Sequence, residues 1–192
     1  NGTWGFISLG TWAVFGTAVQ EPVMDFSVLN AGYGNEFTLG GTNFFARNIT
    51  ALWIIQECKK YWDAEDGRKS GWEEIIAAAE SSKPLASFID VDDPDFAAVQ
   101  TAMPELIRSY CGKTQQPVPE SRGEISRCVF ESIVLKFKQC FFETEKYTGK
   151  TIDRIHVIGG GSKNRFLCRS TADALGVPVY AGPVEATAMG NL

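Results

Sequence analysis

Residues 154–164 read Arg-Ile-His-Val-Ile-Gly-Gly-Gly-Ser-Lys-Asn, and this stretch decides the fold. Its first half is a short run of apolar and β-branched residues, which is typical of a buried strand. The run stops at Gly159, Gly160 and Gly161, and a helical pattern follows from Asn164 to Leu175. Three missing side chains let backbone amides and a flat or anionic ligand approach closely. The residues alone leave two interpretations open, a nucleotide-binding corner or a tight strand-to-helix turn without a ligand.

Downstream of this corner, the sequence predicts a second strand and a second helix. Gly176 ends the first helix, residues 177–180 form a strand, and a last helix opens at Pro183. The glycine run is not the dinucleotide fingerprint, because residues 162–165 supply no third glycine at the required spacing. The tail is therefore predicted to be β-α-β-α.

Upstream of the corner, the pattern is mostly helical. Apolar residues recur at about every fourth position between Gly123 and Thr148, which predicts a long central packing helix. Earlier helices are predicted over residues 49–62, with Asn48 as the N-cap, and over residues 71–81. A further helix, capped by Asp95, is predicted over residues 96–110, where Pro104 is able to split it.

The beginning of the chain predicts short strands. Two of them, over residues 4–8 and 12–18, are joined by the tight connection Leu9-Gly10-Thr11, and two more are predicted at residues 26–30 and 36–39. The hydroxyl and turn amides of the hairpin tip are suited to phosphate oxygens. Together with the glycine corner, the hairpin provides opposite walls for a cleft.

Composition excludes several classes of function. The net charge is -5 and the basic residues are scattered, so the chain offers no basic patch for nucleic acid. No apolar run reaches the roughly 18–20 residues that span a membrane, and Asn1 opens no targeting segment. We therefore expect a cytoplasmic protein of 192 residues that fits one domain.

The cysteines and acidic residues predict no metal site. The five cysteines show no zinc-type spacing, and His156, the single histidine, is expected to be a structural or surface residue and not a general base. Cys111 and Cys128 flank a loop that a disulfide could close, but a reducing compartment favours free thiols. Residues 90–95 hold four aspartates around a proline, and we interpret them as solvated turn and cap residues.

Five sequence blocks follow one another along the chain: Ser-Leu-Gly-Thr-Trp (8–12), Arg-Asn-Ile-Thr-Ala-Leu-Trp-Ile-Ile-Gln (47–56), Gln-Pro-Val-Pro-Glu-Ser (116–121), Val-Ile-Gly-Gly-Gly-Ser (157–162) with Asn164, and Ala-Gly-Pro-Val-Glu-Ala-Thr-Ala-Met-Gly-Asn (181–191). In this order they resemble the C-terminal domain of the FGGY family of carbohydrate kinases, and within it the rhamnulokinase branch. The resemblance implies an α/β fold of the actin-like, ribonuclease-H-like type, with a mixed β-sheet and flanking helices.

The resemblance also assigns roles to individual residues. Thr11 would contact an ATP phosphate, Asn164 would face the adenine, and Asn48 would reach the sugar. The remaining residues implied for nucleotide binding are Gly159, Gly160 and Gly161, which would line the adenosine pocket, and Gln56.

For the whole protein, the resemblance implies transfer of the ATP γ-phosphoryl group, with Mg²⁺, to a sugar hydroxyl, most closely that of L-rhamnulose. Residues 1–192 would be the C-terminal nucleotide-binding domain. The general base, an aspartate in a His-Asp-Thr-like motif, would precede Asn1 in an N-terminal domain, so this chain alone is expected to be inactive. Two alternatives stay open: a non-catalytic nucleotide-binding module, and a kinase for fuculose, xylulose or glycerol.

Overall fold

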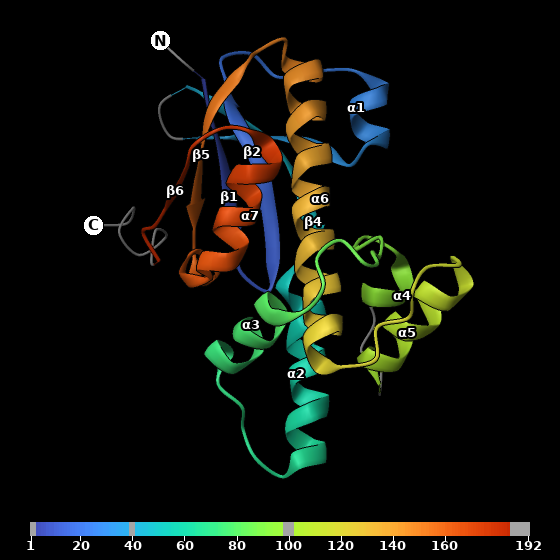
Figure 1. Cartoon of the computed structure of the whole chain (residues 1–192). Helices are drawn as coiled ribbons and strands as arrows, with labels where there is room; N and C mark the ends of the chain where they lie inside the picture. The colour runs from blue at the N-terminus through green and yellow to red at the C-terminus, as the bar shows by residue number, and fades with distance from the viewer. Residues whose placement is uncertain (1–2, 39–40, 98–101, 185–192) are drawn as a thin grey trace. The chain divides into compact units, whose positions relative to one another are not determined.

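The computed structural model describes residues 3–38, 41–97 and 102–184. The chain divides into two compact units (Figure 1). Residues 1–49 and 136–192 form the first, which we call the sheet unit, and residues 50–135 form the second, the helical unit. The predicted last helix lies mainly beyond residue 184, outside the described residues.

The sheet unit is built on a six-stranded mixed sheet with the strand order β3-β4-β2-β1-β5-β6. β1 is antiparallel to β2 and parallel to β5, and β5 is parallel to β6. The predicted N-terminal hairpin and the predicted mixed sheet are therefore confirmed. The strands are β1 (Thr3–Leu9), β2 (Trp12–Val19), β3 (Tyr33–Phe37), β4 (Asn43–Thr50), β5 (Ile152–Ile158) and β6 (Val179–Ala181).

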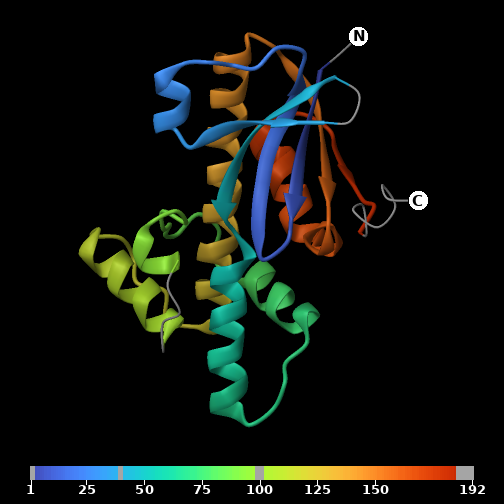
Figure 2. The same ribbon diagram turned by 180° about the vertical axis from the view of Figure 1, so that it is seen from behind.

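One face of this sheet packs on helices. Alternate side chains of the central strands, such as Ile7 and Phe15, are fully buried, as expected for a strand with one face in the core. The Phe15 ring lies 6.4 Å from that of Phe137 on α6 (Arg122–Thr148). The predicted helix after the corner, α7 (Arg165–Leu175), lies on the same side, so the strands stand in front of both helices in the reverse view (Figure 2).

The opposite face of the sheet carries a row of aromatic rings. The row contains the rings of Phe44 on β4, Phe6 and Trp4 on β1, His156 on β5 and Tyr180 on β6, with neighbouring centroids 5.1–6.2 Å apart. Such separations are those of stacked and edge-on aromatic pairs. His156 lies between Trp4 and Tyr180 in this row and has a structural role, as expected.

The helical unit contains the helices predicted for the middle of the chain. They are α2 (Leu52–Asp66), α3 (Trp72–Ser81), the short α4 (Pro94–Ala97), α5 (Met103–Lys113) and the first half of α6. Pro104 stands in the first turn of α5, where a missing amide costs nothing, so the predicted long helix is indeed split.

The aspartates of residues 90–95 act as turn residues. Asp90 accepts a hydrogen bond from the Asp92 amide at 3.1 Å, and Asp93 accepts one from the Asp95 amide at 3.0 Å. The Asp92 carboxylate accepts the amide of Thr50 at 3.1 Å. The interpretation as turn and cap residues is confirmed, but the residue that caps α4 (Pro94–Ala97) is Asp93 and not the predicted Asp95, which lies within that helix.

All five cysteines are free thiols, as expected. Cys111 and Cys128 nevertheless lie in contact between α5 and α6. The Cys128 thiol lowers the pKa of Cys111, whereas the same contact and burial raise the pKa of Cys128.

Residues 26–30 do not form the predicted strand. They form the short helix α1 (Phe26–Asn30), and only Val28 in it is buried. The Asp25 carboxylate accepts the Ser27 amide at 2.6 Å and caps this helix, so the local Asp-x-Ser signal outweighs the β-propensity of the apolar residues.

Asn48 is not the N-cap of the next helix, contrary to the prediction. It lies within β4, and α2 begins only at Leu52, after Ala51, which makes no side-chain cap bond. The reason is tertiary. β4 is held in the sheet, and the amide of Thr50 is satisfied by the Asp92 side chain from 42 residues away.

Truncation of the central packing contact will show how strongly α6 holds the sheet. Phe137→Ala should lower the free energy of unfolding by about 3–5 kcal/mol, because it removes a fully buried ring from against Phe15. Urea unfolding followed by circular dichroism measures this loss. Phe142→Ala, on the same helix but 52% exposed, is the control and should cost less than about 1 kcal/mol. Equal losses in the two variants would contradict this packing.

Candidate functional site

The glycine corner packs directly on the hairpin between β1 and β2. A Cβ atom on Gly161 would lie 2.3 Å from Cγ of Leu9, and one on Gly159 would lie 2.8 Å from the Leu9 carbonyl oxygen. Gly159 also has a φ of +86°, a conformation that residues with a side chain rarely adopt. These two glycines are therefore required for the corner to fit against Leu9.

Gly160 differs from its two neighbours. It is exposed, and a Cβ atom placed on it would meet no atom within 4 Å. The middle glycine is thus dispensable for packing, yet it leaves a patch of bare backbone open to solvent. A flat ligand can approach the chain closely at this position.

The hairpin tip and the glycine corner lie at the same edge of the sheet. β1 and β5 are parallel, with Ser8 opposite Ile158, so the segments that follow their carboxyl ends meet there. Ligands of α/β folds commonly bind outside the carboxyl ends of parallel strands. Figure 2 shows the end of β4 pointing toward this edge as well.

Thr11 stands at the exposed tip of the hairpin. The Gly10 amide donates to the Trp12 carbonyl at 2.9 Å and closes the turn, which leaves the Thr11 side chain in solvent. Its hydroxyl and the turn backbone are accessible to an anionic ligand.

Asn164 has a defined structural role. Its side-chain oxygen accepts the Leu167 amide at 3.0 Å and caps α7, and the residue is only 9% exposed. The amide nitrogen of the same side chain is the group left to donate to a ligand.

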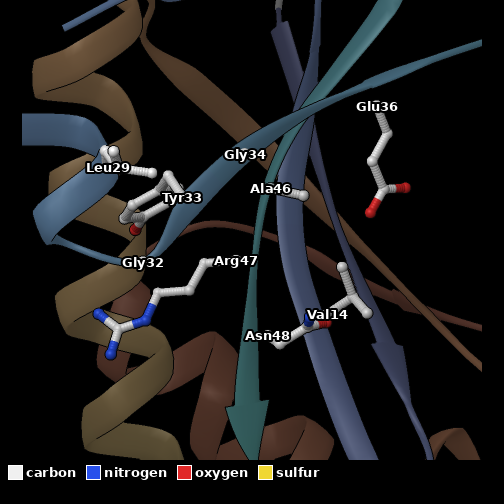
Figure 3. A pocket seen from close by; sticks show the side chains of 9 residues that line it. All are labelled: Val14, Leu29, Gly32, Tyr33, Gly34, Glu36, Ala46, Arg47 and Asn48. Atoms are coloured by element: carbon white, nitrogen blue, oxygen red, sulfur yellow. The ribbon is translucent and has the colours of Figure 1, made fainter. Parts of the chain in front are cut away.

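Asn48 is exposed on β4 and lines a pocket of about 270 Å³. Val14, which follows the hairpin tip on β2, lines the same pocket (Figure 3). In that view Asn48 and Val14 lie on one side of β4, while Arg47 projects to the other. The pocket therefore connects Asn48 with the hairpin strand.

The far side of this pocket is anchored to α6. The Tyr33 ring stacks on Phe45 at 4.8 Å, and its hydroxyl donates to the Cys140 carbonyl at 3.1 Å. Burial raises the pKa of Tyr33 above its ordinary value, so the hydroxyl stays protonated. Arg47 lies 3.6 Å from Glu143 on the same helix. This side of the pocket is therefore held in place by its contacts with α6, and we assign no reactive role to Tyr33 or Arg47.

Six of the seven predicted site residues belong to the sheet unit: Thr11, Asn48, Gly159, Gly160, Gly161 and Asn164. Within this unit the structure brings the hairpin tip and the glycine corner together. The seventh, Gln56, is a half-buried residue of α2 in the helical unit.

Sequence reasoning missed Leu9 as the residue that joins corner and hairpin, and it missed the pocket around Asn48. The run of three glycines could have predicted a contact of this kind, since glycines in a tight corner often indicate that another segment is packed closely against them.

Two general findings concern metal ions and membranes. In residues 3–38, 41–97 and 102–184, no group of three or more His, Cys, Asp or Glu side chains is arranged to hold a metal ion. No helix among these residues is both long and apolar enough to span a membrane.

The three glycines should respond differently to a methyl group. Gly161→Ala should lower the free energy of unfolding by about 1–3 kcal/mol, because the new atom overlaps the buried Leu9 side chain. Gly160→Ala should change it by less than about 1 kcal/mol, since the space there is open. Urea denaturation of the two variants provides the comparison, and a Gly160 variant as unstable as the Gly161 variant would disprove this packing.

A family model and related protein sequences indicate one family. Residues 5–192 match the model described as the FGGY family of carbohydrate kinases, C-terminal domain. A rhamnulokinase of Bacteroides thetaiotaomicron is 39% identical over 187 residues, which are 97% of this chain and 37% of that protein. A rhamnulokinase of Bacillus subtilis is 35% identical over 192 residues, 100% of this chain and 39% of that protein. The chain thus spans less than two-fifths of the length of these relatives.

Solved structures show the same fold at low identity. A xylulose kinase from Bifidobacterium adolescentis matches with a TM-score of 0.60 and 19% identity, covering 93% of this chain and 33% of that one. A glycerol kinase of Plasmodium falciparum with ADP matches with a TM-score of 0.63 and 13% identity, covering 97% of this chain and 36% of that one. The expected actin-like, ribonuclease-H-like fold is confirmed, and the chain belongs to the FGGY family of carbohydrate kinases, of which it carries the C-terminal domain.

Proposed function

We propose that this chain is the nucleotide-binding C-terminal domain of an ATP-dependent sugar kinase that phosphorylates L-rhamnulose. The observation that carries the proposal is the contact that Leu9 makes between the glycine corner and the hairpin of β1 and β2, whose tip is suited to phosphate oxygens. It provides one element for adenosine and one for phosphates at a single edge of the sheet. The rhamnulokinases that match nearly the whole chain at 32–39% identity support the choice of sugar.

Three predicted site residues of the sheet unit have a proposed part in nucleotide binding. The bare backbone at Gly160 would face the adenosine, with the Asn164 amide beside it. The Thr11 hydroxyl and the turn amides would donate to phosphate oxygens, which stabilises the charge that develops on the transferred group. Gln56 is retained as a further nucleotide contact.

An ATP-binding site at this edge is compatible with the residues present. Gly160 offers the space that a Cβ would reduce, and the hairpin presents a hydroxyl without a carboxylate beside it. Mg²⁺ would accompany the ATP phosphates and neutralise their charge. The groups of this chain would position the nucleotide.

We propose that transfer requires a second wall of the cleft, supplied by an N-terminal domain. In the proposed enzyme an aspartate upstream of Asn1 accepts the proton of the sugar hydroxyl, and an N-terminal domain supplies most of the sugar pocket. We propose that the protein acts in the cytoplasm, where ATP and free sugars are available.

A side chain that covers the exposed backbone at Gly160 should weaken nucleotide binding. In the intact protein that contains this domain, Gly160→Val should raise the dissociation constant for ATP at least about tenfold, because the side chain would occupy the adenosine position. Isothermal titration calorimetry measures the change. Ala64→Val, exposed on α2, is the control and should bind ATP like the parent protein. Equal affinity in the Gly160 variant would exclude the corner as the pocket.

The sugar is tested with a panel of acceptors. The intact protein should phosphorylate L-rhamnulose with a higher kcat/KM than L-fuculose, D-xylulose or glycerol, and residues 1–192 alone should show no transfer. An assay of ADP release coupled to NADH oxidation gives the rates. ATP binding without phosphorylation of any of the four acceptors would favour a non-catalytic module instead.

A further inference from the structure

The pocket beside Asn48 has a floor that is almost free of side chains. In the antiparallel ladder of β3 and β4, Gly34 pairs with Ala46 and Glu36 pairs with Phe44. Directly paired residues point to the same face of a sheet, and so do residues two apart on one strand. Gly34, Glu36, Ala46 and Asn48 therefore share one face.

The bare floor creates the space in the pocket. A Cβ atom on Gly34 would meet no atom within 4 Å, and Ala46 contributes only a methyl group. The whole pocket, which Leu29, Gly32, Tyr33 and Arg47 line as well, has a volume of about 270 Å³, close to the roughly 300 Å³ at the lower end of small-molecule pockets. The pocket is therefore large enough for one small ligand.

Two polar side chains lie at the borders of this floor. Both Asn48 and Glu36 are exposed, and Figure 3 shows Glu36 and Val14 on the same side of β4 as Asn48. A carboxylate accepts hydrogen bonds from hydroxyl groups, whereas an amide both donates and accepts. Val14 adds an apolar surface for C–H groups. Arg47 also lines the pocket, from the other side of β4, where it lies 3.6 Å from Glu143. The combination of Glu36, Asn48 and Val14 suits a molecule that carries several hydroxyls.

The backbone that carries Glu36 is held in place from both sides. Asn35 accepts the Val23 amide at 2.9 Å and donates to the Val23 carbonyl at 3.1 Å, which ties β3 to the loop before α1. Two residues earlier, Tyr33 is stacked on Phe45 and hydrogen-bonded to α6. A side chain on a fixed strand keeps its direction better than one on a loop, and preorganisation of this kind favours specific binding.

We propose that Glu36 is a second sugar contact, which accepts hydrogen bonds from ketose hydroxyls on the opposite side of the bare floor from Asn48. This inference rests on the proposed function, because it assigns the pocket to the sugar of that kinase. It also gives Gly34 a role, since only a residue without a side chain leaves the floor open.

Two substitutions test the contact in the intact protein. Glu36→Gln should raise the KM for L-rhamnulose at least about tenfold, as expected when a charged hydrogen bond is lost, with the KM for ATP unchanged. Gly34→Val should do the same by filling the floor. Glu21→Gln makes the same change of charge on an exposed residue outside the pocket and should leave both KM values unchanged.

The outcomes separate this proposal from the function on which it rests. An unchanged KM for the ketose in both variants, in a protein that phosphorylates L-rhamnulose, would overturn the role of Glu36 alone. A parallel rise in the KM for ATP would also overturn it, because it would indicate a general disturbance. A parent protein that binds ATP but phosphorylates no ketose would overturn the proposed function and this inference together. Glu36→Gln adds no atoms, so it reports on the contact even if Gly34→Val fails to fold.

Discussion

The contact of Leu9 with the glycine corner is the constraint on which the site depends. Parallel pairing of β1 with β5 brings the ends of the two strands together, and the Leu9 side chain then occupies the space in which a Cβ of Gly161 would lie. Leu9 is 1% exposed, so the contact is part of the core and also supports the surface. A change in the core at this point would move both the hairpin and the corner, because protein interiors are close-packed and transmit displacements.

The three glycines divide two tasks between them. Gly159 and Gly161 permit the close approach to Leu9, whereas Gly160 faces solvent. Asn164 continues this division, since its oxygen caps α7 and its nitrogen is left for other partners. A rigid support beneath an exposed backbone favours binding, because the backbone is already ordered in the folded protein and loses little conformational entropy when the ligand binds. The pocket between β3 and β4 follows the same principle, with Asn35 and Tyr33 as supports and Glu36 and Asn48 as exposed groups.

Short sequence patterns predicted the structure correctly where they were compatible with only one local conformation. The corner, the hairpin, α6 and α7 all lie close to the predicted positions, because glycine runs, tight turns and four-residue apolar periodicity are determined within a few residues. The predictions failed where two local signals competed. Residues 26–30 have apolar side chains that favour a strand, yet the Asp25 cap forms a helix. Asn48 is a residue type that often caps helices, yet it lies in β4. The hydrogen bond from the Thr50 amide to Asp92 joins residues 42 positions apart, so a local sequence pattern cannot predict it.

The sequence by itself determined the family, the mixed α/β character and the identity of the residues at the corner and the hairpin tip. Those features follow from side chains that are present or absent within short segments. The tertiary structure alone decided that Leu9 joins these two segments, that Asn48 belongs to a strand, and that Gly34 and Ala46 leave an open floor beside Glu36. Such facts depend on strand register and on contacts between residues more than a hundred positions apart, and a sequence pattern of short range contains neither.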